Sequence, residues 1–200
     1  FIAASPELLV RREGQRASTV ALAGSIGRSA DPAVDDHLGE RLLRSDKDRE
    51  ENAIVVRRIA RTLRPLSVWV TAAREPALVR VANIQHLATP IRAQLASPVA
   101  AIELAGALHP TPAVGAEPGD QAASLIPALE GIDRGWYAGP VGWTDATGDG
   151  EFCVTLRCAL LSGPIARCYA GGGIVRESDP ARELAETEVK LQALLPLLSG

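Results

Sequence analysis

The chain has 200 residues, 46% of them hydrophobic and 22% charged, which is enough to bury the core of one globular domain. Its formal net charge of -3 argues against nucleic acid as a partner, because nucleic-acid binders usually carry a basic patch. The sequence has no apolar run near the roughly 20 residues that cross a bilayer, so we expect no membrane span. Three cysteines without metal-ligand spacing fit reduced thiols in the cytoplasm.

The N-terminal third is expected to form a hairpin followed by two helices. Two strand-like segments, Glu7–Arg12 and Arg16–Ala23, flank a Glu-Gly turn, and the stretch 23–29 is interpreted as a loop. A first helix begins at Asp31, which precedes a proline at the first helical position. Ser45 is expected to cap a second helix that ends near residue 63.

The remaining elements alternate between short strands and helices. Helices are expected over Leu104–Ala107, near Gln121–Glu130 and from Asp179 to about Leu198. Strands are expected at Ser67–Thr71, Ala77–Ile84, Ile91–Leu95, Trp136–Trp143, Glu151–Leu161 and Ile165–Ala170. Long hairpins and segregated helices predict an α+β fold, with largely antiparallel sheets flanked by helices in one domain over residues 1–200.

The last expected helix carries residues that could bind a cation or an anion. Glu183, Glu186 and Lys190 are spaced at i, i+3 and i+7, which places them on one helix face. Two carboxylates one turn apart can share a hard cation such as Mg²⁺, and the lysine could hold an anionic substrate. The alternative is an ordinary Glu–Lys pair on a solvated face.

The helix after Ser45 repeats this arrangement. Asp48 and Glu51 are again at i and i+3, with Lys47 beside them. Because the segment is crowded with charge, an exposed helix face is the alternative interpretation. The two carboxylate pairs could converge on one metal, but spacing alone does not establish that they do.

Two further features could bind an anion. The Gly171-Gly172-Gly173 triplet would let backbone N–H groups approach a negative charge, although a plain tight turn is the alternative. Arg157 lies in an expected apolar strand, where it could clamp a carboxylate or face water at a sheet edge.

Taken together, these motifs resemble the second half of the chorismate-utilising enzymes, and most closely the isochorismate-synthase type. The resemblance extends over essentially all 200 residues in order. The segment His109–Val114, which begins with His-Pro, resembles the isochorismate type. Anthranilate and aminodeoxychorismate synthases carry a different sequence after this His-Pro pair. The matching segments are Ala4–Glu7, Leu22–Ser25, Ser45–Glu51, Gln85–Thr89, Leu108–Val114, Arg134–Gly139, Val141–Trp143, Gly148–Glu151, Tyr169–Val175 and Glu186–Lys190.

The resemblance implies an active site for Mg²⁺-dependent conversion of chorismate to isochorismate. It assigns Glu7 as the general acid that protonates the departing 4-hydroxyl group, which requires a raised pKa. It places His86 on the ring-carboxylate side of the substrate, Gly24 where the backbone passes close to the ring, and Ala113 among the substrate-binding residues. The groups implied to hold the enolpyruvyl carboxylate or add positive charge are Tyr137, Arg157, Gly171, Gly172, Gly173 and Lys190.

The resemblance also implies the metal ligands. Glu51 and Glu186 would ligate Mg²⁺, with Asp48 and Glu183 as supporting carboxylates, and the metal would bridge the protein and the ring carboxylate of chorismate. Three positions depart from the family pattern: Asn52 stands where a histidine is frequent, Gly172 where an alanine is common, and Gly27 where a proline is frequent.

The missing initiator methionine suggests a fragment. In the family, a lysine of the N-terminal half acts as the general base on the attacking water, and neither Lys47 nor Lys190 matches it. We therefore expect the 200-residue chain alone to be inactive and the full-length protein to be a cytoplasmic monomer. The alternatives are a salicylate synthase, which would go on to eliminate pyruvate, and a truncated chain that at most binds ligand. The product would feed menaquinone or siderophore biosynthesis.

Overall fold

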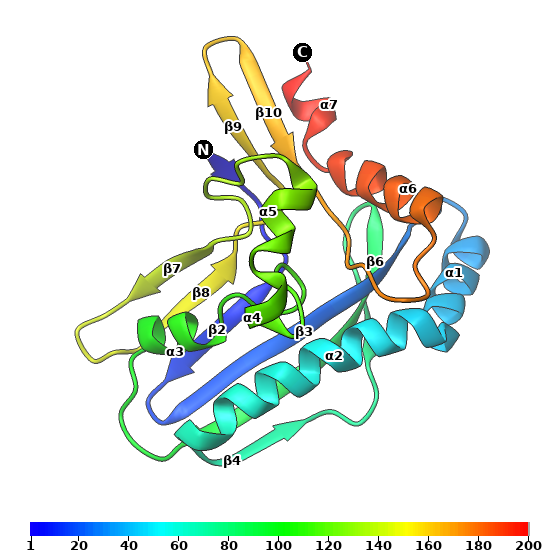
Figure 1. Cartoon of the computed structure of the whole chain (residues 1–200). Coiled ribbons are helices and arrows are strands. Elements are labelled where there is room, and N and C mark those ends of the chain that lie inside the picture. Colours follow the sequence, from blue (N-terminus) through cyan, green and yellow to red (C-terminus); the bar gives the residue numbers. More distant parts are fainter. Residues whose placement is uncertain (200) are drawn as a thin grey trace.

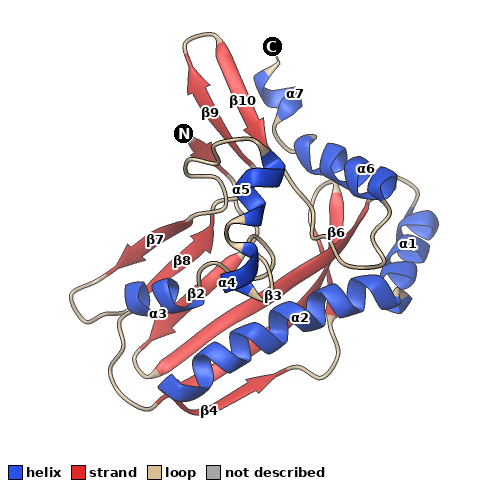
Figure 2. Ribbon diagram, viewed as in Figure 1, coloured by secondary structure: helices blue, strands red, loops and turns tan. Residues whose placement is uncertain are grey.

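The computed structural model describes residues 1–199, which fold into two antiparallel sheets with helices packed against them (Figure 2). The large sheet has the strand order β4-β6-β3-β2-β8-β7, with β5 pairing to β6, and the small sheet has the order β1-β9-β10. The strands are β1 (Ile2–Ala3), β2 (Leu8–Glu13), β3 (Arg16–Gly27), β4 (Ser67–Ala72), β5 (Ala77–Arg80), β6 (Ile84–Leu95), β7 (Pro140–Thr144), β8 (Gly150–Val154), β9 (Cys158–Ser162) and β10 (Ile165–Tyr169). The predicted α+β class is confirmed.

The centre of the large sheet is the pair of long strands β3 and β6. Their register aligns Arg16 with Gln94 at one end and Gly27 with Ile84 at the other, and it shifts between Leu22 and Ser25. The predicted loop over 23–29 is therefore wrong, because cross-strand hydrogen bonds to β6 continue the strand to Gly27. Residues 85–90, which the sequence left between two strands, likewise belong to β6.

Two helices precede β4 and one of them covers the large sheet. α1 (Pro32–Arg44) begins as predicted, with the Asp31 carboxylate accepting from the backbone N–H groups of Ala33 and Val34. α2 (Asp46–Leu63) begins at Ser45, whose hydroxyl accepts from the Asp48 N–H. In Figure 1, α2 runs along β3, and its buried face carries Asn52, Val55, Ile59 and Leu63.

The core lies between α2, α3 and the large sheet. α3 (Ala101–Leu108) buries Leu104 and Leu108 against strand residues such as Leu9 and Val10. The burial of these side chains supplies the main stabilisation of the fold. The remaining short helices are η1 (Arg64–Leu66), α4 (Gly119–Ala122) and α5 (Leu125–Glu130), so the single helix expected near 121–130 forms as two.

The second predicted strand of the C-terminal part, Glu151–Leu161, is two strands in two different sheets. β8 pairs with β2 in the large sheet, and β9 pairs with β1 and β10 in the small one. The chain changes sheet at residues 155–157, where Arg157 has a φ of 48°, a left-handed conformation that ends a strand. Arg157 therefore lies in a connection and not inside a strand.

The last helix begins as predicted but is interrupted. Asp179 caps α6 (Pro180–Leu191) by accepting from the Arg182 N–H, and α7 (Leu195–Leu198) follows after a break. Figure 1 shows the β9–β10 hairpin and the C-terminal end of the chain projecting on the same side of the molecule. Within the described residues, no helix has the length and hydropathy that a bilayer crossing would require.

Candidate active site

Four carboxylates from two helices, called here the acidic cluster, lie together at the N-terminal end of α2. Asp48 and Glu51 come from the first turns of α2, Glu183 from the first turn of α6 and Glu186 from the middle of α6. All four side chains are at most 16% exposed. The ion pair of Lys47 with Glu183, described next, joins the two helices, so the two carboxylate pairs do lie together.

Two lysines neutralise part of the acidic cluster. Lys47 Nζ lies 2.8 Å from Glu183 Oε1, 3.7 Å from Glu51 Oε2 and 3.8 Å from Asp48 Oδ1. Lys190 Nζ lies 2.5 Å from Glu186 Oε1 and donates to the Gly171 carbonyl at 3.0 Å. With all groups ionised, four carboxylates face two ammonium groups, which leaves two negative charges uncompensated.

Burial and the neighbouring charges shift the pKa values of the carboxyl groups in the acidic cluster. Burial, reinforced by the charges of Glu186 and Asp48, raises the pKa of Glu51 to about 7 despite the opposing lysines. Burial also raises the pKa of Asp48. For Glu186, burial is outweighed by the charge of Lys190 and by hydrogen bonds from Lys190 and Ser25, so its pKa is lowered. A bound cation would relieve the repulsion that Glu51 experiences.

The acidic cluster fits a hard divalent cation in ligand type and charge. Its donors are carboxylate oxygens, and Glu183 Oε2 is buried with no hydrogen-bond partner. In residues 1–199, however, no group of three or more His, Cys, Asp or Glu side chains is arranged so that it could hold a metal ion. Lys47 Nζ lies within 3.8 Å of three of the four carboxylates.

The predicted glycine turn passes directly over the acidic cluster. A Cβ atom on Gly173 would lie 2.8 Å from Glu51 Cδ, and one on Gly172 would lie 3.2 Å from Glu183 Oε2. At Gly173 a side chain would collide with the end of the Glu51 side chain and push it aside, which the glycine avoids. The turn is thus part of the site and not merely a surface turn.

Gly24 and Ser25 bring β3 against the same cluster. Gly24 has a φ of 81°, and a Cβ atom there would lie 2.9 Å from Asp48 Cβ. Ser25 Oγ donates to Glu186 Oε1 at 2.5 Å. The sequence predicted Gly24 but not Ser25, whose position directly after Gly24 was the available signal.

Glu7 is buried at the start of β2. Its backbone N–H donates to Ser5 Oγ at 3.2 Å, and its carbonyl accepts from the Val154 N–H at 3.1 Å, which fixes the residue between β2 and β8. Burial raises the pKa of Glu7 to about 7, although the charges of Lys190 and Arg157 oppose the rise. The raised pKa expected of a general acid is therefore present.

Arg157 and His86 meet beside Glu7. Arg157 Nη2 lies 3.3 Å from His86 Nε2, and because a guanidinium can only donate, that imidazole nitrogen is the acceptor. Burial, together with the charges of Arg157 and Lys190, lowers the pKa of His86 to about 4. His86 is therefore neutral near pH 7, and Arg157 keeps its charge for an anionic ligand.

Aromatic residues border the glycine turn. Tyr137 stacks on Tyr169 with ring centroids 5.4 Å apart, and a Cβ atom on Gly171 would lie 2.9 Å from the Tyr137 hydroxyl oxygen. Burial raises the pKa of Tyr137, which therefore stays a neutral hydrogen-bond donor. Ala113 packs against the hydrophobic core, and none of the hydrogen bonds of residues 1–199 joins it to the acidic cluster.

A buried amide that the sequence did not identify holds α2 in place. Asn52 Nδ2 donates to the backbone carbonyls of Ala21, Ala23 and Leu87 at 3.1, 3.4 and 3.3 Å, and its Oδ1 accepts from Thr89 Oγ1 at 2.6 Å. These bonds fix the helix next to Glu51 against both central strands. The signal in the sequence was that Asn52 stands where a histidine is frequent in the family.

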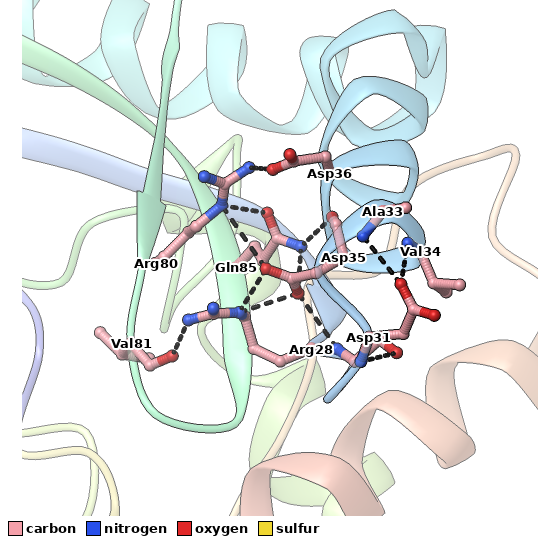
Figure 3. A network of polar contacts seen from close by, with 10 residues as sticks. Arg28, Asp31, Ala33, Val34, Asp35, Asp36, Arg80, Val81 and Gln85 are labelled. Atoms are coloured by element: carbon pink, nitrogen blue, oxygen red, sulfur yellow. Dashed lines mark hydrogen bonds and ion pairs between the residues drawn. The ribbon is translucent and has the colours of Figure 1, made fainter.

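A second polar network holds β6 beside the site (Figure 3). The Asp35 carboxylate accepts from Arg28 Nε at 2.9 Å, and Gln85 Nε2 donates to the Asp35 carbonyl at 2.9 Å. Arg80 Nε donates to Gln85 Oε1 at 3.1 Å. Because Gln85 precedes His86 in the chain, this network ties α1 to the strand segment that carries His86.

The comparisons with known proteins agree with this geometry. The family model for chorismate binding enzymes matches residues 1–199. The salicylate biosynthesis isochorismate synthase of Pseudomonas aeruginosa is 48% identical over the whole chain, which covers 42% of that protein. The chain thus spans about half the length of the curated relatives it matches.

Solved structures show the same similarity in three dimensions. The structure of a candidate 2,3-dihydroxybenzoate-specific isochorismate synthase from Bacillus anthracis has a TM-score of 0.96 at 44% identity, over 99% of this chain and 53% of that one. The menaquinone-specific isochorismate synthase of Escherichia coli has a TM-score of 0.88 at 37% identity, over 98% of this chain and 45% of that one. Sequence, fold and site together place this chain in the family of chorismate binding enzymes.

Proposed function

We propose that the protein is an isochorismate synthase, which converts chorismate to isochorismate with Mg²⁺. The observation that carries the proposal is the buried carboxyl group of Glu7, whose pKa of about 7 keeps a proton available near neutrality. Relatives whose names assign them to three different pathways are all isochorismate synthases, which supports this reaction while leaving the pathway open.

In the proposed reaction, water adds to one ring carbon while the 4-hydroxyl leaves from another. Glu7 donates its proton to the departing hydroxyl, which leaves as water. Both ring double bonds of chorismate shift by one position as the new C–O bond forms and the old one breaks. Arg157 and the Tyr137 hydroxyl hold the enolpyruvyl carboxylate, and Lys190 adds positive charge on the same side. Neutral His86 lines the ring-carboxylate side without adding a charge of its own.

The carboxylates of Glu51 and Glu186, with Asp48 and Glu183 in support, would hold Mg²⁺. When bound, the metal supplies positive charge that binds and polarises the ring carboxylate of the substrate. The glycine turn and Gly24 let backbone approach this region closely, which restricts how the substrate ring can lie.

The proton of the attacking water must pass to a base. Lys47 and Lys190 are each ion-paired with carboxylates, so neither offers a free amine. We therefore expect the 200-residue chain to bind chorismate without turnover, and a chain as long as its relatives to catalyse the reaction.

The three free cysteines among the described residues fit our proposal of a cytoplasmic enzyme.

The test is chromatography of the products formed from chorismate by the longer protein. Isochorismate formation that stops when EDTA removes Mg²⁺, and stops in Glu7→Gln while substrate binding persists, supports the proposal. Salicylate with pyruvate would identify a salicylate synthase instead, and normal turnover by Glu7→Gln would refute the role of Glu7.

A further inference from the structure

Lys47 reaches from the first turn of α2 to carboxylates of both helices in the acidic cluster. Its Nζ is 2.8 Å from Glu183 on α6, and within 3.8 Å of both Glu51 and Asp48 on α2. Among residues 1–199, the ion pair of Lys190 is with Glu186, one turn away on its own helix. Lys47 is therefore the cation that links the two helices across the cluster.

We propose that Lys47 is a built-in counter-cation that competes with Mg²⁺ for the acidic cluster. This inference rests on the metal site of the proposed function. In the metal-free protein the ammonium group offsets repulsion among buried carboxylates, so it holds α6 against α2. When a divalent cation enters, Lys47 gives up its contacts with Glu51 and Asp48. The lysine thus sets how much Mg²⁺ is needed to fill the site.

The surroundings of Lys47 provide room for this movement. A cavity of about 630 Å³ opens beside it, and Lys47, Asn52 and Thr89 line the cavity on the side of the cluster. Three arginines (Arg49, Arg57 and Arg74) also line the cavity, and Arg57 pairs with Glu50. Asp46 and Glu177, which also line it and form no ion pair among the described residues, are the carboxylates that the displaced ammonium would meet. The flexible lysine stem can make such a move without a change in the backbone.

Replacing Lys47 by methionine tests the competition, because the substitution keeps most of the stem and removes the charge. The uncompensated charge of the cluster rises from two to three, so Mg²⁺ should bind about tenfold more tightly by calorimetry. The metal-free protein should melt at a lower temperature than the wild type, and Mg²⁺ should raise its melting temperature by more. Arg61→Met is the matched control, because Arg61 is on the same helix but pairs with Glu117, away from the cluster and from this cavity.

A measurement on the wild type keeps the proposal testable if Lys47→Met does not fold. The chain has only two lysines, so acylation of Lys47 can be followed by mass spectrometry with Lys190 as the comparison. Saturating Mg²⁺ should increase the labelling of Lys47 at least severalfold, and unchanged or reduced labelling would overturn the proposal. Unchanged Mg²⁺ affinity in Lys47→Met would refute the role of Lys47 alone, whereas no Mg²⁺ binding by the wild type would also refute the metal site.

Discussion

Replacing Glu7 by glutamine removes an ionisable group from the interior while keeping its shape. Glu7 is only 5% exposed, and burial raises its pKa from 4.5 to about 7 against the pull of Lys190 and Arg157. The folded protein therefore binds this proton more tightly than the unfolded chain does. The stability that Glu7 contributes is complete below pH 4.5 and is lost as the pH rises through 7.

The size of this effect follows from the two pKa values. A difference between 4.5 and about 7 corresponds to about 3 kcal/mol of unfolding free energy. Because glutamine cannot ionise, Glu7→Gln should match the wild type near pH 4.5 and be about 3 kcal/mol more stable than the wild type above pH 7. The substitution would thus stabilise the fold under the same conditions in which it abolishes the proposed acid catalysis.

Urea denaturation of both proteins from pH 4.5 to 8.5 measures this difference directly. Taking the difference between the two proteins cancels every other titrating group, including Glu51. Glu13→Gln, at the exposed end of the same strand, is the matched control and should change stability by only a few tenths of a kcal/mol. A Glu7→Gln advantage that does not vary with pH would refute the reasoning.

Three further predictions concern the site and its supports. Gly173→Ala should displace the end of Glu51 and weaken Mg²⁺ binding about tenfold in calorimetry. Gly106→Ala is the control and should leave Mg²⁺ affinity unchanged, because a methyl group there meets open space. Equal Mg²⁺ affinities of Gly173→Ala and the wild type would contradict the close approach of Gly173 to Glu51. Asn52→Ala should cost about 3 kcal/mol in urea denaturation, because it leaves buried carbonyl groups without a donor, and a loss below 1 kcal/mol would show that they find other partners. NMR titration should show the His86 side chain neutral at pH 5, since burial lowers its pKa to about 4, and imidazolium signals at pH 6 would contradict this. Because the pKa is lower in the folded protein, the stability that neutral His86 contributes is lost as the pH falls from 6.5 through 4.

Local signals in the sequence predicted the beginnings of three helices correctly, whereas α3 begins at Ala101, three residues before its predicted start. Asp31, Ser45 and Asp179 each cap a helix through hydrogen bonds to backbone N–H groups two or three residues away. The hairpin of β2 and β3 was predicted for a similar reason, since its turn is short. The strand ends were less accurate, because pairing with β6 extends β3 to Gly27.

The site was only partly predictable, because its residues come from segments that lie far apart in the sequence. The i, i+3 spacing within α2 and within α6 put two carboxylates on one face of each helix, and the family resemblance then supplied their roles. Ser25, which hydrogen-bonds Glu186 across 161 residues, had no local signal beyond its neighbour. Asn52 was visible only as a departure from the family pattern.

The sequence by itself determined the α+β class, the capped helices, the carboxylate pairs and the family. The caps and the carboxylate pairs depend on residues that are close together in the sequence, and the family resemblance depends on motifs that occur in a fixed order. Only the tertiary structure decided that Lys47 bridges α2 and α6, that the chain changes sheet at Arg157, and that Glu7 is buried. These features depend on contacts between segments more than 100 residues apart, where burial and charge act through space.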